Sequence, residues 1–172
     1  MQVESRILGL LADDSDKTRM FSLKTLSILF TSHVAGISTE FLVKSGAEIS
    51  DALNDKEPAN REEGVRCLGS FLHYCADNTA REEDKRLSDT VSLVLNSLLL
   101  HMDDESEGLR DLILGCLITL PVVLQAVLEE KVTRCLSSHR HTEHLHTLLQ
   151  TVTRVQDGAK YPANETSSST NV

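Results

Sequence analysis

Apolar residues recur along most of this chain at intervals of three or four, the spacing of amphipathic helices. In one such segment Leu145, Leu148, Leu149, Val152 and Val155 line one helix face. Helix start and stop signals predict helices at about residues 2–12, 16–32, 39–54, 59–76, 84–102, 107–119, 122–136 and 142–155. Leucine is the most frequent apolar residue, and aromatic residues make up only 3% of the chain. The pattern therefore predicts an all-α fold in which helices pack on helices.

Three stretches of the chain align with one another, namely LADDSDKTRMFSLKTL, LNDKEPANREEGVRCL and MDDESEGLRDLILGCL. In each stretch an aspartate precedes an arginine by six residues, and apolar residues stand four and seven positions after the arginine. The pairs are Asp13 with Arg19, Asp55 with Arg61, and Asp104 with Arg110. The copies begin 42 and then 49 residues apart, which is typical of a two-helix repeat. We therefore predict a HEAT/armadillo-type helical-repeat solenoid of about four antiparallel helix pairs.

The repeated aspartates and arginines have structural explanations. An aspartate in front of a helix can cap the exposed amides of the first turn, and its charge suits the helix N-terminus. The arginine of a HEAT repeat typically contacts the turn aspartate of a neighbouring repeat, so we expect a ladder of such contacts along the stack. For the fourth predicted helix, Asn60 and Glu63 are candidates for a capping pair.

The chain divides into an expected repeat domain, residues 1–155, and a polar tail, residues 156–172, that is rich in Ser and Thr and expected to be disordered. The repeat domain opens directly into a helix, without a recognisable capping repeat. An uncapped array exposes its first hydrophobic face. We expect either a short isoform or terminal piece of a longer protein, or an open end that docks on something.

Charge limits the classes of partner. Asp and Glu number 26 against 17 Lys and Arg, which gives a net charge of −9. This balance opposes nucleic acid as a partner, and no basic amphipathic helix suggests a membrane surface. The longest apolar run, residues 112–124, is too short to span a bilayer, and residues 1–20 lack a signal-peptide pattern. We therefore expect a cytosolic or nuclear protein whose partners are proteins, with basic segments favoured by the acidic surface.

The stretch SSHRHTEHLH contains His139, His141, His144 and His146 and is the first candidate for a metal site. At 100° per residue, only His141 and His144 could converge on one ion, and no Cys or suitably placed carboxylate completes a set of ligands. We therefore interpret the histidines as loop and helix-entry residues. A histidine-mediated metal-binding module stays open as the less favoured alternative.

Other candidate chemistry is equally sparse. Cys67, Cys75, Cys116 and Cys135 lie in apolar helical segments without a C-x-x-C pair, so buried reduced thiols are favoured over a zinc site. The acid pairs recur at equivalent turns, as a structural role predicts. No phosphate-binding loop, G-x-S-x-G or H-E-x-x-H motif is present. We expect no catalytic residues, no cofactor and no metal, and hence no enzyme.

Residues 95–152, beginning LNSLLLHMDDESEGLRDLILGCL, resemble the carboxy-terminal end of the HEAT-repeat dynein axonemal assembly factor family. The shared parts are a leucine-rich helix ending in LLLHMDD, an LRD-L-IL helix, a linking helix, and a short amphipathic helix with an HR…LL pattern. More loosely, the resemblance extends over residues 9–155. Family proteins are far longer helical arrays than this chain.

The resemblance implies a cytoplasmic, non-catalytic factor that helps to assemble axonemal dynein arms before their transport into cilia. Its implied partners are axonemal dynein chains, chaperones and other assembly factors. The family offers no catalytic or cofactor-binding residue to carry over to this chain. The alternative in the same class is a HEAT-repeat adaptor for a transport, kinase or phosphatase complex.

Overall fold

The computed structural model describes residues 2–32, 36–79 and 84–160, and every regular element in these ranges is helical. The elements are α1 (Gln2–Gly9), the 3-10 helix η1 (Leu10–Ala12), α2 (Asp16–Thr31), α3 (Thr39–Asp51), the 3-10 helix η2 (Ala52–Asn54), α4 (Pro58–Thr79), α5 (Lys85–His101), α6 (Glu107–Ile118), α7 (Val122–Cys135) and α8 (Glu143–Lys160). The predicted all-α class is confirmed.

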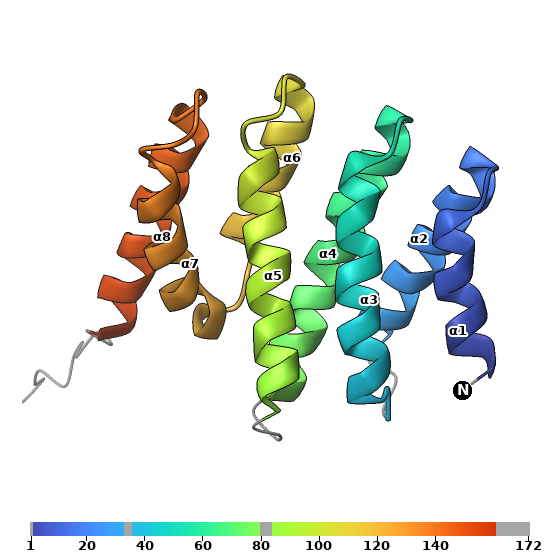
Figure 1. Cartoon of the computed structure of the whole chain (residues 1–172). Coiled ribbons are helices and arrows are strands. Elements are labelled where there is room, and N and C mark those ends of the chain that lie inside the picture. The colour runs from blue at the N-terminus through green and yellow to red at the C-terminus, as the bar shows by residue number, and fades with distance from the viewer. Residues whose placement is uncertain (1, 33–35, 80–83, 161–172) are drawn as a thin grey trace, which may run out of the picture.

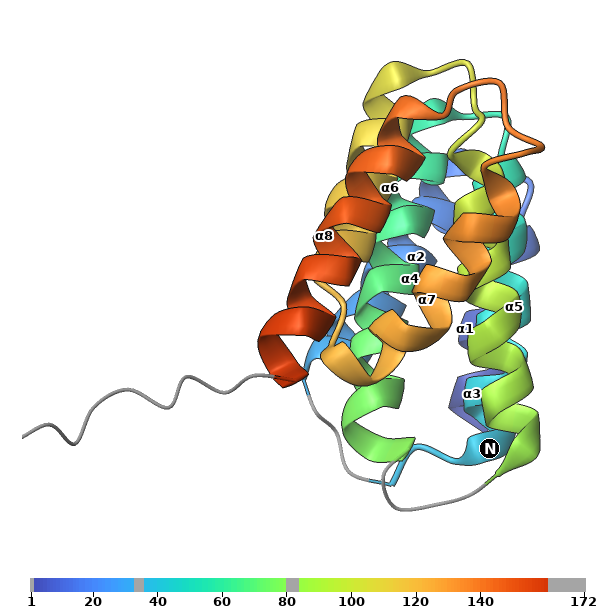
Figure 2. The same cartoon turned by 90° about the vertical axis from the view of Figure 1, so that its left-hand side faces the viewer.

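The helices form a row of four pairs in sequence order, from α1–α2 at one end to α7–α8 at the other (Figure 1). One layer contains α1, α3, α5 and α7, and the second contains α2, α4, α6 and α8, as the view along the row shows (Figure 2). The turns inside the pairs, at residues 13–15, 55–57, 102–106 and 136–142, lie along one edge of the row, which we call the turn edge. The most extensive contacts join helices of the same layer, such as α2 with α4 and α3 with α5, and the two helices of the last pair, α7 and α8.

Helix boundaries follow local capping chemistry. The side chains of Ser15, Ser38 and Ser106 accept hydrogen bonds from amides in the first turns of α2, α3 and α6. Pro58 is the first residue of α4, where its missing N–H costs nothing. The predicted first and third helices end in the short 3-10 segments η1 and η2. These tight turns redirect the chain toward α2 and α4.

The last helix is longer than expected. α8 continues to Lys160, so the first five residues of the expected disordered tail, 156–160, are helical. Residues 161–172, the remainder of that expected tail, lie outside the described residues.

The core is a continuous seam of apolar side chains between the two layers. Of the residues four and seven positions after the repeat arginines, five are buried: Leu23, Val65, Leu26, Leu68 and Leu117. The sixth, Leu114, is half-buried. Where the first two pairs meet, the ring of Phe30 packs edge-on against Phe71, with centroids 5.5 Å apart. These contacts join neighbouring pairs into one core.

Gly46 marks the closest approach between α3 and its neighbours. A Cβ built on this glycine would collide with Thr90 Cγ2 of α5 and would lie 3.1 Å from Phe71 Cζ of α4. Val94 Cγ2 would lie 3.4 Å away. Because buried side chains fill this space, α3 can approach α5 only through a residue without a side chain.

We predict that Gly46→Ala lowers the free energy of unfolding by about 1–3 kcal/mol, because overpacking outweighs the better helix propensity of alanine. The matched control is Gly108→Ala in α6, where an added Cβ meets nothing within 4 Å. This control should leave stability unchanged or slightly raised. Urea unfolding of both variants measures the difference, and equal stabilities would contradict the close packing at Gly46.

Candidate functional site

The three repeated turns share one local geometry. In each turn the aspartate carboxylate accepts a hydrogen bond from the amide two residues later. The bonds are Ser15 N to Asp13 Oδ1 (2.9 Å), Glu57 N to Asp55 Oδ1 (2.9 Å) and Ser106 N to Asp104 Oδ1 (2.8 Å). The aspartates therefore shape the turns, as Asx turns do, and do not cap the helices as expected. Ser15 and Ser106 provide the caps of α2 and α6.

Each repeat arginine closes the turn that precedes it. Its Nη1 donates to the carbonyl oxygen of the aspartate six residues earlier. The pairs are Arg19 with Asp13 (2.8 Å), Arg61 with Asp55 (3.0 Å) and Arg110 with Asp104 (2.5 Å). Arg19 and Arg110 also donate to the next carbonyl, that of Asp14 and Glu105. The six-residue spacing seen in the sequence thus corresponds to one repeated hydrogen bond between an arginine and its own turn.

Between the first and second turns, Arg19 makes the expected ladder contact. Its Nε donates to Asp55 Oδ2 at 2.6 Å and its Nη2 donates to Asp55 Oδ1 at 2.9 Å. Asn60 Nδ2 donates to the same carboxylate at 3.0 Å and to the Asp16 carbonyl at 3.2 Å. Asn60 therefore ties α4 to α2 and is not part of the capping pair expected with Glu63. The hydrogen bond from Arg19 lowers the pKa of the Asp55 carboxyl to about 2.

The later turns are joined by different contacts. The Nε atoms of Arg61 and Arg110 are buried without a hydrogen-bond partner, so they do not continue the ladder. Between the second and third turns, His101 Nε2 lies 3.3 Å from Asn54 Oδ1. The fourth turn, SSHRHT, contains no acidic residue that could pair with Arg110. The ladder contact is therefore specific to Arg19 and Asp55.

Asp103 holds the fourth turn against the third. Its Oδ1 accepts from the amides of Arg140 (2.8 Å) and His141 (3.0 Å), and its Oδ2 accepts from Arg140 Nε at 3.1 Å. Burial raises the pKa of the Asp103 carboxyl, but the hydrogen bonds from His141 and Arg140 outweigh it and lower the pKa to about 2. The sequence does not distinguish Asp103 from the neighbouring repeat position Asp104, because both belong to one acid pair.

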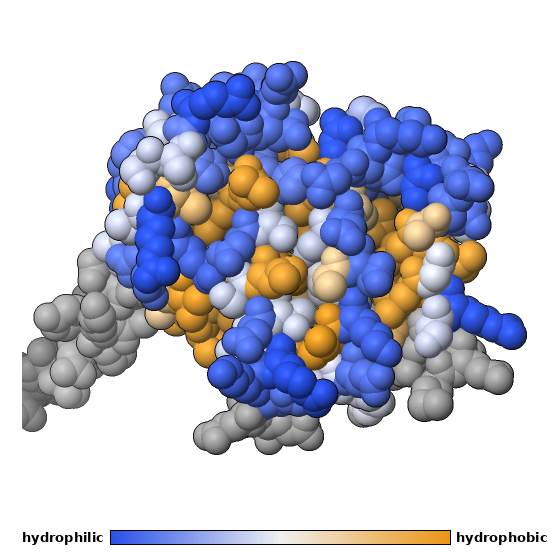
Figure 3. Space-filling view, in the orientation of Figure 1, coloured by the Kyte–Doolittle hydropathy of each residue, from blue (hydrophilic) through white to orange (hydrophobic). Residues whose placement is uncertain are grey.

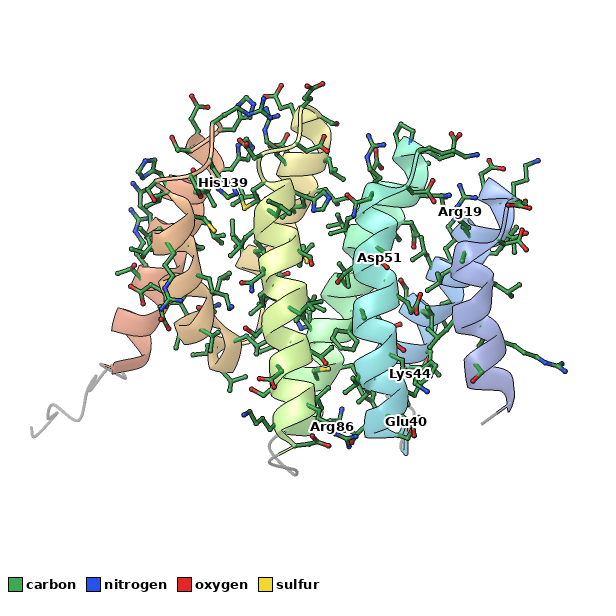
Figure 4. The ribbon with its side chains drawn as sticks, viewed as in Figure 1. Arg19, Glu40, Lys44, Asp51, Arg86 and His139 are labelled. Atoms are coloured by element: carbon green, nitrogen blue, oxygen red, sulfur yellow. The ribbon has the colours of Figure 1, made fainter. Side chains whose placement is uncertain are left out.

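The histidines of the fourth turn point in separate directions. His139 Nε2 lies 2.7 Å from the Leu99 carbonyl oxygen of α5, and His144 Nε2 lies 2.8 Å from Asp111 Oδ1 of α6. The side chains of His141 and His146 are exposed. His141 and His144, the pair that helix geometry brings nearest, therefore do not converge. Figure 4 shows His139 and Arg19 near the turn edge, at opposite ends of the row.

Within the described parts of the chain, no three His, Cys, Asp or Glu side chains meet in a way that could hold a metal ion. All four cysteines are free; Cys67 and Cys75 are buried, and Cys116 and Cys135 are half-buried. Burial raises the pKa of the Cys67, Cys75 and Cys116 thiols to about 12. These three side chains are therefore neutral thiols near pH 7, the unreactive form of cysteine.

The surface carries three features that could contact a partner. Exposed carboxylates gather on the turn edge, at Asp14, Asp16, Glu57, Glu105 and Glu107. A groove of about 360 Å³ lies between α4 and α6, with Val65, Gly69, Leu112 and Cys116 among its lining residues. Large apolar side chains are exposed on α2, α5 and α7, and Figure 3 shows such surface interspersed with polar residues on one face. Among the helices as far as they are described, none is long and apolar enough to cross a membrane.

The chain was compared with known proteins as a whole. No protein-family model matches it, and no curated protein sequence matches it. The functional proposal therefore depends on the geometry of the turns and surfaces, together with the resemblance of residues 95–152 noted above.

We predict that Asp55→Asn lowers the free energy of unfolding at pH 7 by about 1–2 kcal/mol, because the variant loses a charged partner of Arg19. The folded carboxyl has a pKa of about 2, below its ordinary value of 3.8, so its stabilisation is full above that ordinary value. The stabilisation disappears as the pH falls toward 2.

Urea unfolding from pH 7 to pH 2 should therefore show the difference between Asp55→Asn and wild type shrinking below about pH 4. Asp51→Asn is the matched control, since Asp51 lies exposed on α3 near the same turn (Figure 4). A constant difference over the whole pH range would contradict the charged contact.

We predict that Asp103→Ala loosens the fourth turn without unfolding the chain, because the amides of Arg140 and His141 lose their acceptor. Hydrogen exchange at these two amides should become about tenfold faster or more. Asp111→Ala is the control, since it removes only the side-chain contact with His144 and leaves both amides bonded. Unchanged exchange in Asp103→Ala would show that the turn is held by other contacts.

Proposed function

We propose that this chain is a non-enzymatic protein-interaction scaffold, built as a HEAT/armadillo-type solenoid of four antiparallel helix pairs. Two observations support the repeat assignment. Three turns have the same aspartate and arginine hydrogen bonds, and all of them lie along one edge of the row. Stacked helix pairs of this kind present extended surfaces to other proteins.

The observation that carries the binding role is the charge of the turn edge. Exposed carboxylates from the first three turns stand along it, including Asp14, Glu57 and Glu105. The exposed cations there include Lys56 and Arg140, of which Arg140 is paired with Asp103. Such an edge attracts basic segments of client proteins and speeds their encounter, with an effect that salt screens.

The more specific proposal is preassembly of axonemal dynein arms in the cytoplasm, for cilium motility. It is supported by the resemblance of residues 95–152 to the HEAT-repeat dynein axonemal assembly factors. The clients would be axonemal dynein chains, and chaperones and other assembly factors would act beside the scaffold. Co-purification of partners with this chain from ciliated and non-ciliated cells tests this role. An assembly factor for dynein arms should recover its clients from ciliated cells, whereas an adaptor for another complex should recover the same partners equally from both cell types.

We predict that the chain binds basic fragments of dynein heavy or intermediate chains with an affinity that falls steeply as salt rises from about 50 to 300 mM. The double variant Asp14→Lys, Glu105→Lys should weaken binding about tenfold or more at low salt, because it reverses two charges on the turn edge. Isothermal titration calorimetry measures both effects.

The matched control is Glu48→Lys, Asp89→Lys, which makes the same charge change at exposed positions inside α3 and α5. This control should retain most of the wild-type affinity. An affinity that does not depend on salt, or that falls equally in both double variants, would show that the turn edge is not part of the binding site.

A further inference from the structure

One face of α2 is exposed and carries both apolar and basic side chains. We call it the end face, defined by Lys17, Phe21, Lys24 and Ile28. These residues follow one another at intervals of four, three and four, so they form one stripe along the helix. Phe21 is 69% exposed and Ile28 is 65% exposed, unusual values for large apolar residues in the middle of a packed helix.

The end face points out of the row of helices. Leu23, Leu26 and Phe30 bury the opposite side of α2, and helix geometry places Phe21 and Ile28 about 180° from them. The main contacts of α2 are with α1, η1 and α4, and α1–α2 is the last pair at its end of the row (Figure 1). No described helix covers the stripe.

The other end of the row is closed by a polar surface. Over residues 143–155 of α8, the exposed side chains are hydrophilic and include His146, Thr147, Gln150 and Arg154. The two ends of the described row therefore differ chemically, since among these residues only the α1–α2 end presents an exposed apolar stripe.

The charge of the end face identifies the kind of partner. Lys17 and Lys24 are exposed, and neither forms an ion pair with another described residue. No acidic residue stands in the stripe, although the chain as a whole has a net charge of −9. Two free cations beside two exposed apolar side chains fit a surface that is apolar and acidic.

We propose that the end face binds an amphipathic helix of a partner protein, with Asp or Glu flanking its apolar side chains. The stripe extends over three helical turns, about 16 Å, which a helix of three to four turns would cover. The apolar residues of the partner, spaced at i, i+4 and i+7, contact Phe21 and Ile28, and its carboxylates contact Lys17 and Lys24. This surface rests on the scaffold role proposed above. It adjoins the turn edge at Lys17, extends from there along α2, and takes a ligand of opposite charge.

A second copy of the chain fits the end face less well. Two copies joined through the same face would bring the lysines of one stripe next to those of the other, which is unfavourable. A head-to-tail arrangement would place Phe21 and Ile28 against the polar side chains of α8. The first arrangement leaves the lysines without opposite charges, and the second leaves the apolar side chains without an apolar partner. An acidic amphipathic helix provides carboxylates for the lysines and apolar side chains for Phe21 and Ile28.

The test uses the full chain and two synthetic helices of about eighteen residues. Both peptides carry leucines at helical spacing; one has glutamates and the other lysines at the flanking positions. Fluorescence anisotropy should show binding of the acidic peptide and at least about tenfold weaker binding of the basic one. The variant Lys17→Glu, Lys24→Glu should reverse this preference.

A second variant isolates the apolar contacts. The variant Phe21→Ser, Ile28→Ser should lower the affinity for the acidic peptide about thirtyfold, because it removes two apolar side chains that become buried in the complex. Leu100→Ser on α5 is the matched control, since Leu100 is 66% exposed but lies on another helix, and it should leave binding unchanged. Thermal unfolding of each variant, with a midpoint close to that of wild type, shows that the fold is retained.

Several results would overturn the proposal. They are failure of both peptides to bind, equal binding of both, or equal loss in the Phe21→Ser, Ile28→Ser and Leu100→Ser variants. A wild-type dimer that the Phe21→Ser, Ile28→Ser variant dissociates in sedimentation velocity would assign the face to a second copy. Tighter binding to anionic lipid vesicles than to the acidic peptide would assign it to a membrane.

Failure of the end-face proposal can be distinguished from failure of the turn-edge proposal. Asp14→Lys, Glu105→Lys should weaken the binding of basic dynein fragments without weakening the binding of the acidic peptide, because Asp14→Lys adds positive charge next to Lys17. Loss of acidic-peptide binding with intact basic-client binding overturns the end face alone.

Discussion

The architecture depends on one repeated interaction, in which a buried or half-buried arginine donates to the carbonyl oxygen of the aspartate six residues before it. This bond fixes the sharp reversal between the two helices of a pair, and the aspartate carboxylate completes the turn through the amide two residues later. Because backbone carbonyls at such a turn lack helical partners, the guanidinium satisfies them where solvent is excluded. The helices of each pair can then bury their apolar faces together.

Neighbouring turns are joined by contacts that differ along the row. The first two share the charged contact between Arg19 and Asp55, and the last two share the hydrogen bonds of Asp103 with the amides of Arg140 and His141. The repeat arginine therefore does not make the same contacts in every repeat. Arg61 and Arg110 close their own turns but leave one buried nitrogen unpaired, which costs stability that the surrounding apolar burial must offset.

The two proposed binding surfaces follow from the same stacking. Turns on one edge collect the exposed carboxylates of consecutive pairs, although these residues are about forty or more positions apart in the chain. In the same way, no described helix packs on one side of α2, where Phe21, Ile28 and two lysines lie. A scaffold with an acidic edge and a basic apolar end could hold two partners of opposite charge at once.

Helix positions and repeat register were readable from the sequence, because they depend on residues three, four or seven apart along one helix. The six-residue spacing of Asp13–Arg19, Asp55–Arg61 and Asp104–Arg110 was readable for the same reason. The hydrogen bond that closes each turn was not predicted, because the sequence indicated aspartate caps and arginine contacts between neighbouring turns. Only the tertiary structure decided which partners Asn60, Asp103 and His139 take, since each bonds a residue more than thirty positions away. It also decided that, of the three repeat arginines, Arg19 makes the expected contact with the next turn. It likewise decided that Phe21 and Ile28 are exposed. The sequence places apolar residues on opposite sides of α2, and the packing of α2 against α4 determines which of them are buried.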